Sequence, residues 1–275
     1  MVTDRIGDYD IIQTLGEGAA GTALLARCPG RLQLGSDHVV VKVLNQHATD
    51  DGFDLMAEEL HYLARIMSPN LVALHEAGLQ GDMLFYSCDY CPDGSLAQPA
   101  RPFTRAAVLA SVADAAIAAH ALHEAGVAHR SIKPGNVLID GHRAKLTDPG
   151  LNEVLNPGRT NAGMNPYGSM EYQAPELIQG DGSSRASDIW ALGATLHRVL
   201  TGRPVYPDLP DDSTVEALRY LLHARPKLHE SLRPEEHDVI GHALDVDPAE
   251  RPPTAMAFAR SVAELAQRYA RSDQP

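Results

Sequence analysis

Apolar residues in the first part of the chain recur mostly at every second position, in short runs that Gly and Asp interrupt. Alternation of this kind predicts half-buried β-strands. The runs cover residues 9–15, 22–27, 38–44, 71–77 and 83–90. One stretch, Phe53 to Met67, instead places its apolar residues at helical spacing and ends before Ser68-Pro69, where a helix is expected to stop.

After Pro92 the spacing becomes helical. A long helix is predicted from Thr104 to Ala125, with Thr104 as its N-cap and Gly126 as its stop. Short strands and loops are predicted for 127–150, and further helices for 187–201, 214–223, 235–244 and 254–269. The expected fold class is α+β and bilobal. It has a strand-rich lobe with one helix at 9–91, a helical lobe at 92–270, and a tail or linker start at 271–275.

Composition narrows the class of protein. The chain has 275 residues, 44% of them hydrophobic, and a formal net charge of −13. A substantial core is expected, and the acidic balance argues against nucleic acid or an anionic membrane as partner. No run approaches the roughly 18 to 20 apolar residues of a membrane span, and the N-terminus lacks an apolar signal core. We expect a cytoplasmic location, and the tail leaves open that a longer protein continues beyond it.

The chain has three cysteines, Cys28, Cys88 and Cys91, which fits a reducing compartment. Cys88 and Cys91 form a CxxC, a spacing that also occurs in zinc and redox sites. Since no second CxxC completes a zinc site, we interpret them as two thiols in a short strand.

Gly16, Gly18 and Gly21 form a GxGxxG. Alone, this pattern also opens dinucleotide-binding helices. Here the residues that follow, Thr22 to Ala26, read as a second strand rather than a helix. Strand, glycine loop and strand is the arrangement that covers the phosphates of ATP in protein kinases.

Lys42 stands inside the apolar run 39–44. A lysine in this place either extends from a strand edge to water or meets an anion, and the glycine loop upstream favours the anion. Glu59 follows on the predicted helix, ten residues before Pro69. This spacing selects the pair Lys42–Glu59 over the adjacent Glu58.

With these residues in this order, the chain resembles eukaryotic-type Ser/Thr protein kinases, in the style of the bacterial members, over roughly residues 9–270. Further motifs carry the resemblance: His-Arg-Ser-Ile-Lys-Pro-Gly-Asn at 129–136, Asp-Pro-Gly at 148–150, Ala-Pro-Glu at 174–176, Asp-Ile-Trp-Ala-Leu-Gly at 188–193, and Arg251. An unrelated fold would not be expected to place all of them in this sequence and spacing.

The resemblance implies ATP and Mg²⁺ as cofactors. It implies that Asn136 and Asp148 hold the metal, that Lys133 contacts the γ-phosphate, and that Glu176 pairs with Arg251. The remaining residues that it places around the nucleotide are Ala23 and Val40 at the adenine, Cys88 behind it, Asp89 to Cys91 in the hinge, and Leu138.

Ser131 occupies the position where the family has an aspartate that orients the substrate hydroxyl and accepts its proton. A serine hydroxyl is neutral at pH 7 and cannot act as that base. Its neighbours His129, Arg130 and Lys133 complete the catalytic loop, and the latter two are cationic. General-base assistance is typically worth ~10² to 10⁴ in rate, so the substitution is expected to impair transfer.

Two further departures concern packing. Pro149 replaces the usual Phe, and proline offers less area, fixes φ and has no N–H. We hypothesise that this loop has one preferred state.

Ala23 stands where the family usually has valine, and Val40 stands where it usually has alanine. The two changes roughly cancel, so the volume of the nucleotide pocket is expected to be conserved. Arg130 can pair with a phosphorylated residue in the family, and Thr160 is the candidate here.

Three functions stay open. The chain is a pseudokinase that binds Mg²⁺–ATP and regulates an unidentified protein partner, or a weakly active Ser/Thr kinase, or a domain that transfers another group from the same pocket. Retention of Lys42, Asn136 and Asp148 favours nucleotide binding, and Ser131 favours the pseudokinase.

Overall fold

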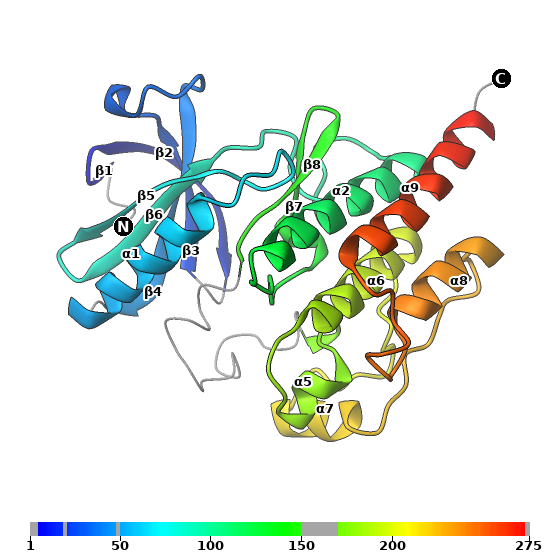
Figure 1. The fold of residues 1–275 in the computed structure, drawn as a ribbon. Helices are drawn as coiled ribbons and strands as arrows, with labels where there is room; N and C mark the ends of the chain where they lie inside the picture. Colours follow the sequence, from blue (N-terminus) through cyan, green and yellow to red (C-terminus); the bar gives the residue numbers. More distant parts are fainter. Residues whose placement is uncertain (1–4, 19–20, 48–49, 150–169, 273–275) are drawn as a thin grey trace. The chain divides into compact units, whose positions relative to one another are not determined.

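The computed structural model describes residues 5–18, 21–47, 50–149 and 170–272 (Figure 1). It divides into two compact units. Of the described residues, the first unit holds 5–67 and 72–90, and the second holds 68–71, 91–149 and 170–272.

The first unit is built on a six-stranded antiparallel sheet in the order β1-β2-β3-β4-β6-β5. Its strands are β1 (Arg5–Ile6), β2 (Tyr9–Gly18), β3 (Gly21–Arg27), β4 (His38–His47), β5 (Leu74–Gln80) and β6 (Met83–Asp89). A short 3₁₀ helix, η1 (Gly30–Leu32), follows β3. Because side chains alternate between the two faces of a strand, one face gathers a core of Ile6, Tyr9, Leu24, Ala26, Val39, Val41 and Phe85.

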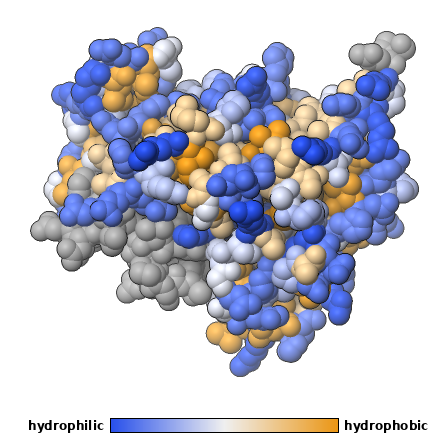
Figure 2. All heavy atoms as spheres, viewed as in Figure 1, coloured by the Kyte–Doolittle hydropathy of each residue, from blue (hydrophilic) through white to orange (hydrophobic). Residues whose placement is uncertain are grey.

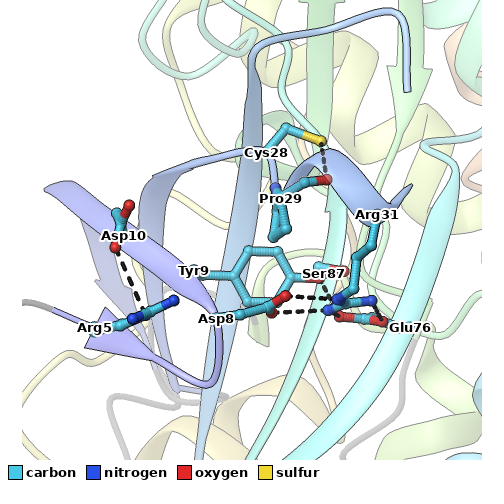
Figure 3. A network of polar contacts seen from close by, with 9 residues as sticks. All are labelled: Arg5, Asp8, Tyr9, Asp10, Cys28, Pro29, Arg31, Glu76 and Ser87. Carbon is cyan, nitrogen blue, oxygen red and sulfur yellow. Dashed lines mark hydrogen bonds and ion pairs between the residues drawn. The ribbon is translucent and has the colours of Figure 1, made fainter. Parts of the chain in front are cut away.

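A polar cluster closes one edge of this core (Figure 3). The hydroxyl of the buried Tyr9 donates to a carboxylate oxygen of Glu76 and lies 2.8 Å from Ser87 Oγ. The guanidinium of Arg31, from η1, pairs with Glu76 at 2.5 Å and with Asp8 at 2.6 Å. Hydrogen bonds from Arg31 lower the pKa of both carboxyl groups. The cluster joins the start of β2 to η1 and β5.

The helix of the first unit, α1 (Asp50–Ala64), begins and ends three residues earlier than predicted. The chain leaves it through tighter turns, in which Ile66 N–H donates to Leu63 O at 3.0 Å. Met67 therefore lies outside the helix and is 88% exposed, so its predicted place on the helix was wrong. β5 also begins three residues later than predicted, because Leu71 instead bridges to Leu146 in the second unit.

The second unit is mainly helical. Its helices are α2 (Arg105–Glu124), α5 (Pro175–Gln179), α6 (Arg185–Thr201), α7 (Thr214–Leu221), α8 (Pro234–Ala243) and α9 (Ala255–Ser272). A hairpin of β7 (Val137–Asp140) and β8 (Arg143–Leu146) follows the 3₁₀ turn η2 (Pro134–Asn136). The α+β class, with strands first and helices after, is confirmed.

Helix α2 is the centre of the second unit and lies along α9 in Figure 1. Alanines on several sides of α2 are fully buried, which lets neighbouring elements approach closely. The predicted cap is confirmed, since Thr104 Oγ1 accepts from Ala107 N–H at 3.1 Å. So is the stop, since Gly126 has φ +81°. By length and hydropathy α2 alone among the described helices would suit a membrane, but 61% of that stretch is buried, as in a core helix.

Helix α9 extends beyond its predicted end at 269 to Ser272, so Arg271 and Ser272 are helical rather than the start of a linker. Within α6, His197 is buried and holds the chain after the helix. Its Nδ1–H donates to Arg203 O at 3.0 Å, and its Nε2 accepts from His229 N–H at 3.0 Å. Burial lowers the pKa of His197 to about 4, which keeps the ring neutral.

On the face shown in Figure 2, hydrophilic residues dominate the described surface and hydrophobic ones are interspersed. Met67 and Val215 are the most exposed of the large hydrophobic side chains in the described ranges. Scattered apolar exposure of this kind is ordinary for a folded domain.

Candidate functional site

One face of the first unit's sheet carries four of the predicted nucleotide residues. Ala23 lies opposite Lys42, and Val40 lies opposite Cys88 in the antiparallel register. Because directly paired residues and residues two apart on a strand share a face, all four point to the same side. Val40 and Cys88 are buried, whereas Ala23 and Lys42 are half-buried. Lys42 therefore shares this face with an apolar surface made by Ala23, Val40 and Cys88.

The glycine motif joins two strands, as predicted, and does not open a helix. β2 ends at Gly18 and β3 begins at Gly21; residues 19–20 lie outside the described ranges. Gly21 has φ +148°, and a Cβ there would lie 1.9 Å from the carbonyl oxygen of Val43. Only glycine fits this approach of β3 to β4. Gly16 has no such restriction, since nothing lies within 4 Å of a Cβ built on it.

Glu59 lies on α1 and is half-buried, whereas Glu58 is exposed. The difference in exposure favours Glu59 as the carboxylate that faces the sheet. Its pairing with Lys42 stays a prediction.

The hinge residue Asp89 closes β6. Its N–H donates to Ala73 O at 3.0 Å, and its carboxylate lies 3.1 Å from Nε2 of His75 on β5. Sequence reasoning missed His75, because only strand pairing reveals that it lies near the hinge. Cys88 and Cys91 are both buried and neither forms a disulfide, and Cys91 belongs to the second unit.

In the second unit, a buried carboxylate holds the backbone of the catalytic-loop motif. Asp188, at the start of α6, accepts hydrogen bonds from His129 N–H at 2.6 Å and Arg130 N–H at 2.9 Å. His123 Nε2 lies 2.8 Å from the same carboxylate. Arg130 has φ +69°, a conformation that costs about 1 to 3 kcal/mol for a non-glycine residue. The bonds to Asp188 offset that strain, and this role of Asp188 and His123 was not predicted.

His129 is fully buried and uses both ring nitrogens to hold the loop. Nε2 lies 3.0 Å from the carbonyl oxygen of Thr147, and Nδ1 lies 3.3 Å from Ser131 N. A carbonyl only accepts, so Nε2 carries the proton and Nδ1 accepts from Ser131 N–H. Burial lowers the pKa of His129, in agreement with a neutral ring.

Ser131 contacts the predicted metal ligand Asn136. Nδ2 of Asn136 donates to the Ser131 carbonyl at 2.7 Å and lies 3.2 Å from Ser131 Oγ. The backbone carbonyl of Asn136 accepts from Thr147 N–H at 3.0 Å, and Thr147 Oγ1 lies 3.5 Å from a carboxylate oxygen of Asp148. Asp148 has φ +61°. Thr147 thus ties the two predicted metal ligands together within one unit, and their amide and carboxylate oxygens suit Mg²⁺.

The predicted pair Glu176–Arg251 is confirmed. Two guanidinium nitrogens of Arg251 donate to the two carboxylate oxygens of Glu176, at 2.7 and 2.9 Å. Arg251 also donates to the carbonyls of Ala186 and Asp245, at 2.9 and 2.8 Å. Its side chain is 0% exposed and stacks near Trp190, 5.0 Å from the ring centroid.

Among the other predicted residues, Lys133 contacts Asn136 through its backbone, since its carbonyl accepts from Asn136 N–H at 2.9 Å. Lys133 is half-buried in extended backbone before η2, Leu138 is half-buried in β7, and Pro149 is half-buried. Thr160 lies outside the described residues, as does the rest of 150–169. The roles of these residues, and the single state of the loop at Pro149, stay predictions.

Comparisons with known proteins agree with this geometry. The family model "Protein kinase domain" matches residues 9–262. Protein kinase C zeta type of Oryctolagus cuniculus is 31% identical over 255 residues, which cover 89% of this chain and 42% of that protein. Aurora/IPL1-related protein kinase 2 of Caenorhabditis elegans is 29% identical over 252 residues, 90% of this chain and 79% of that protein. Protein kinase 3 of Dictyostelium discoideum is 30% identical over 274 residues, 92% of this chain and 29% of that protein. The chain therefore spans less than half of two of these relatives.

Proposed function

Because the chain belongs to the protein kinase family, we propose that it binds Mg²⁺–ATP and regulates a protein partner as a pseudokinase of Ser/Thr kinase signalling. Lys42 would meet the phosphates, beside the surface formed by Ala23, Val40 and Cys88. Asn136 and Asp148 would hold the metal. The metal, when bound, neutralises charge on the phosphate oxygens.

The observation that carries the pseudokinase proposal is the chemistry of the loop at 129–136. Ser131 has a hydroxyl in place of a carboxylate, and Nδ2 of Asn136 lies 3.2 Å from it. His129 is fully buried with both nitrogens engaged, so it cannot take a proton from a substrate hydroxyl. Arg130 and Lys133 are cations. The loop thus has the frame of a catalytic loop without a general base.

A weakly active Ser/Thr kinase is the second candidate. Phosphoryl transfer relies largely on positioning and charge. The contacts that would position the reacting groups are present, since Asp188 holds the loop backbone and Arg251 binds Glu176. Residual transfer without a base would then depend on Lys42 and Lys133.

Transfer of the γ-phosphate from Mg²⁺–ATP separates the two. We would compare the protein, Lys42→Ala and Ser131→Asp, using radiolabelled γ-phosphate with a generic protein substrate and intact mass for self-modification. If the pseudokinase proposal is right, the unchanged protein transfers no γ-phosphate and Ser131→Asp does. Transfer by the parent that Lys42→Ala abolishes would replace the pseudokinase with the weak kinase, and an added adenylyl mass would indicate transfer of the nucleotide itself.

Nucleotide binding needs its own measurement. Binding at a hundredfold excess over Kd stabilises a protein by about 2.7 kcal/mol, which a thermal unfolding curve resolves. Unchanged melting of the parent at millimolar Mg²⁺–ATP would refute the proposed cofactor. The identity of the protein partner and a cytoplasmic location stay predictions.

A further inference from the structure

We propose that Ser131 is a positioning residue for Asn136, whose side-chain amide it holds in the orientation that a metal ligand requires. The inference rests on the proposed binding of Mg²⁺–ATP and deepens it. Under this proposal Ser131 has a role of its own in the cation site, in addition to being the position where the general base is missing.

The first step is the hydrogen-bonding requirement of a buried amide. Asn136 is only 7% exposed, and its Nδ2 carries two hydrogens. Ser131 offers two acceptors, its carbonyl at 2.7 Å and its hydroxyl oxygen at 3.2 Å. Leaving a buried N–H without an acceptor costs about as much as a lost hydrogen bond. Both hydrogen-bond acceptors that lie within reach of this amide nitrogen among the described residues therefore belong to one residue.

The second step is the direction of the amide oxygen. A carbonyl only accepts, so the branch of Asn136 that faces the Ser131 carbonyl is the nitrogen. The oxygen lies on the other branch of the planar group. An amide nitrogen has no lone pair to give to Mg²⁺, whereas the oxygen does. An amide that turns over would thus lose its value as a metal ligand.

The third step is the rigidity of the residue that holds the amide. Ser131 N–H donates to Nδ1 of the buried His129, and Asp188 fixes the two residues before Ser131 through their N–H groups. The backbone that carries both acceptors of Ser131 is therefore held in place before any cation binds. Alanine at this position would keep the carbonyl but not the hydroxyl, and threonine would keep both.

A measurement without nucleotide tests this arrangement directly. The side-chain NH₂ resonances of Asn136 would be assigned by their loss in Asn136→Ala and compared in the parent, Ser131→Ala and Ser131→Thr. We expect one amide proton to move upfield and its exchange with solvent to accelerate in Ser131→Ala, with the parent's signals retained in Ser131→Thr. Identical Asn136 signals in Ser131→Ala and the parent would overturn the proposal.

The second measurement concerns the metal. For each variant, the affinity for ATP is measured by competition with a fluorescent ADP analogue, once with Mg²⁺ and once with EDTA, and the ratio of the two affinities is compared. Ser131→Ala should lower the ratio roughly two- to tenfold, the range of one neutral hydrogen bond, with the EDTA affinity unchanged. Ser131→Thr should keep the parent's ratio.

Ser111→Ala is the matched control, since it removes a serine hydroxyl that donates within α2 to Ala107 O at 2.9 Å. If Asn136→Ala lowers the ratio while Ser131→Ala leaves it unchanged, Ser131 does not position Asn136. If the parent binds nucleotide in neither condition, the proposed function fails, and the Asn136 resonances still decide this inference.

Discussion

Removal of the carboxylate of Glu176 should destabilise the second unit severely. In Glu176→Ala, the guanidinium of Arg251 loses two charge-assisted hydrogen bonds, of 2.7 and 2.9 Å, and among the described residues it keeps two backbone carbonyls as acceptors. Because this guanidinium is 0% exposed, water cannot replace the lost carboxylate. Stranding one member of a buried pair costs about 3 to 5 kcal/mol.

The assay is urea unfolding followed by circular dichroism at 222 nm, with the midpoint and the m-value fitted separately. Glu176→Gln keeps one side-chain acceptor and should lose about half as much. Glu230→Ala, which removes an exposed carboxylate, should change stability by less than about 0.5 kcal/mol. A loss of under about 1 kcal/mol for Glu176→Ala would refute the reasoning, since the pair would then be worth no more than a surface ion pair.

Two further predictions concern pH and the glycine motif. Burial lowers the pKa of His197 from its ordinary value of 6.5 to about 4. Between these pH values the histidine is protonated in the unfolded chain but neutral in the folded chain. Stability should therefore be fully present above pH 6.5 and fall by about 1 to 2 kcal/mol as the pH drops toward 4; an equal pH dependence of urea midpoints in His197→Gln would contradict this. Gly21→Ala should cost about 2 to 4 kcal/mol through its clash and its positive φ, whereas Gly16→Ala should cost less than about 1 kcal/mol. Equal urea midpoints for the two variants would remove the steric argument.

Much of the fold could be predicted because its elements follow simple periodicities. The strands of the first unit alternate, and α2 carries a recognisable cap and stop at Thr104 and Gly126. The bounds of α1 were harder, since its end depends on tertiary contacts of residues 68–71 rather than on local spacing. The strand β1 has only two residues, too few for a periodicity to show.

In the candidate site, too, some residues could be predicted from the sequence and others could not. Lys42 stands out because a lysine inside an apolar strand needs a partner, whereas Asn136, Asp148 and the Glu176–Arg251 pair followed from the family resemblance. The residues that hold them in place did not stand out. Asp188 accepts hydrogen bonds from the loop backbone although it lies 59 residues from His129 in the sequence, and His75 contacts Asp89 from the neighbouring strand. No local pattern in a sequence records such contacts, because they arise only when the strands and helices pack.

The polar cluster at Tyr9 limits where a shortened version of this domain can begin. The family match begins at residue 9, yet β1 and Asp8 lie before it, and Ile6 is 2% exposed within the core. A shortened protein that starts at residue 9 would strip a strand from the sheet, open its edge for association with other chains, and deprive Arg31 of one of its two carboxylates. Protein designers who graft or swap this domain by sequence match alone would thus begin their chain inside its structure.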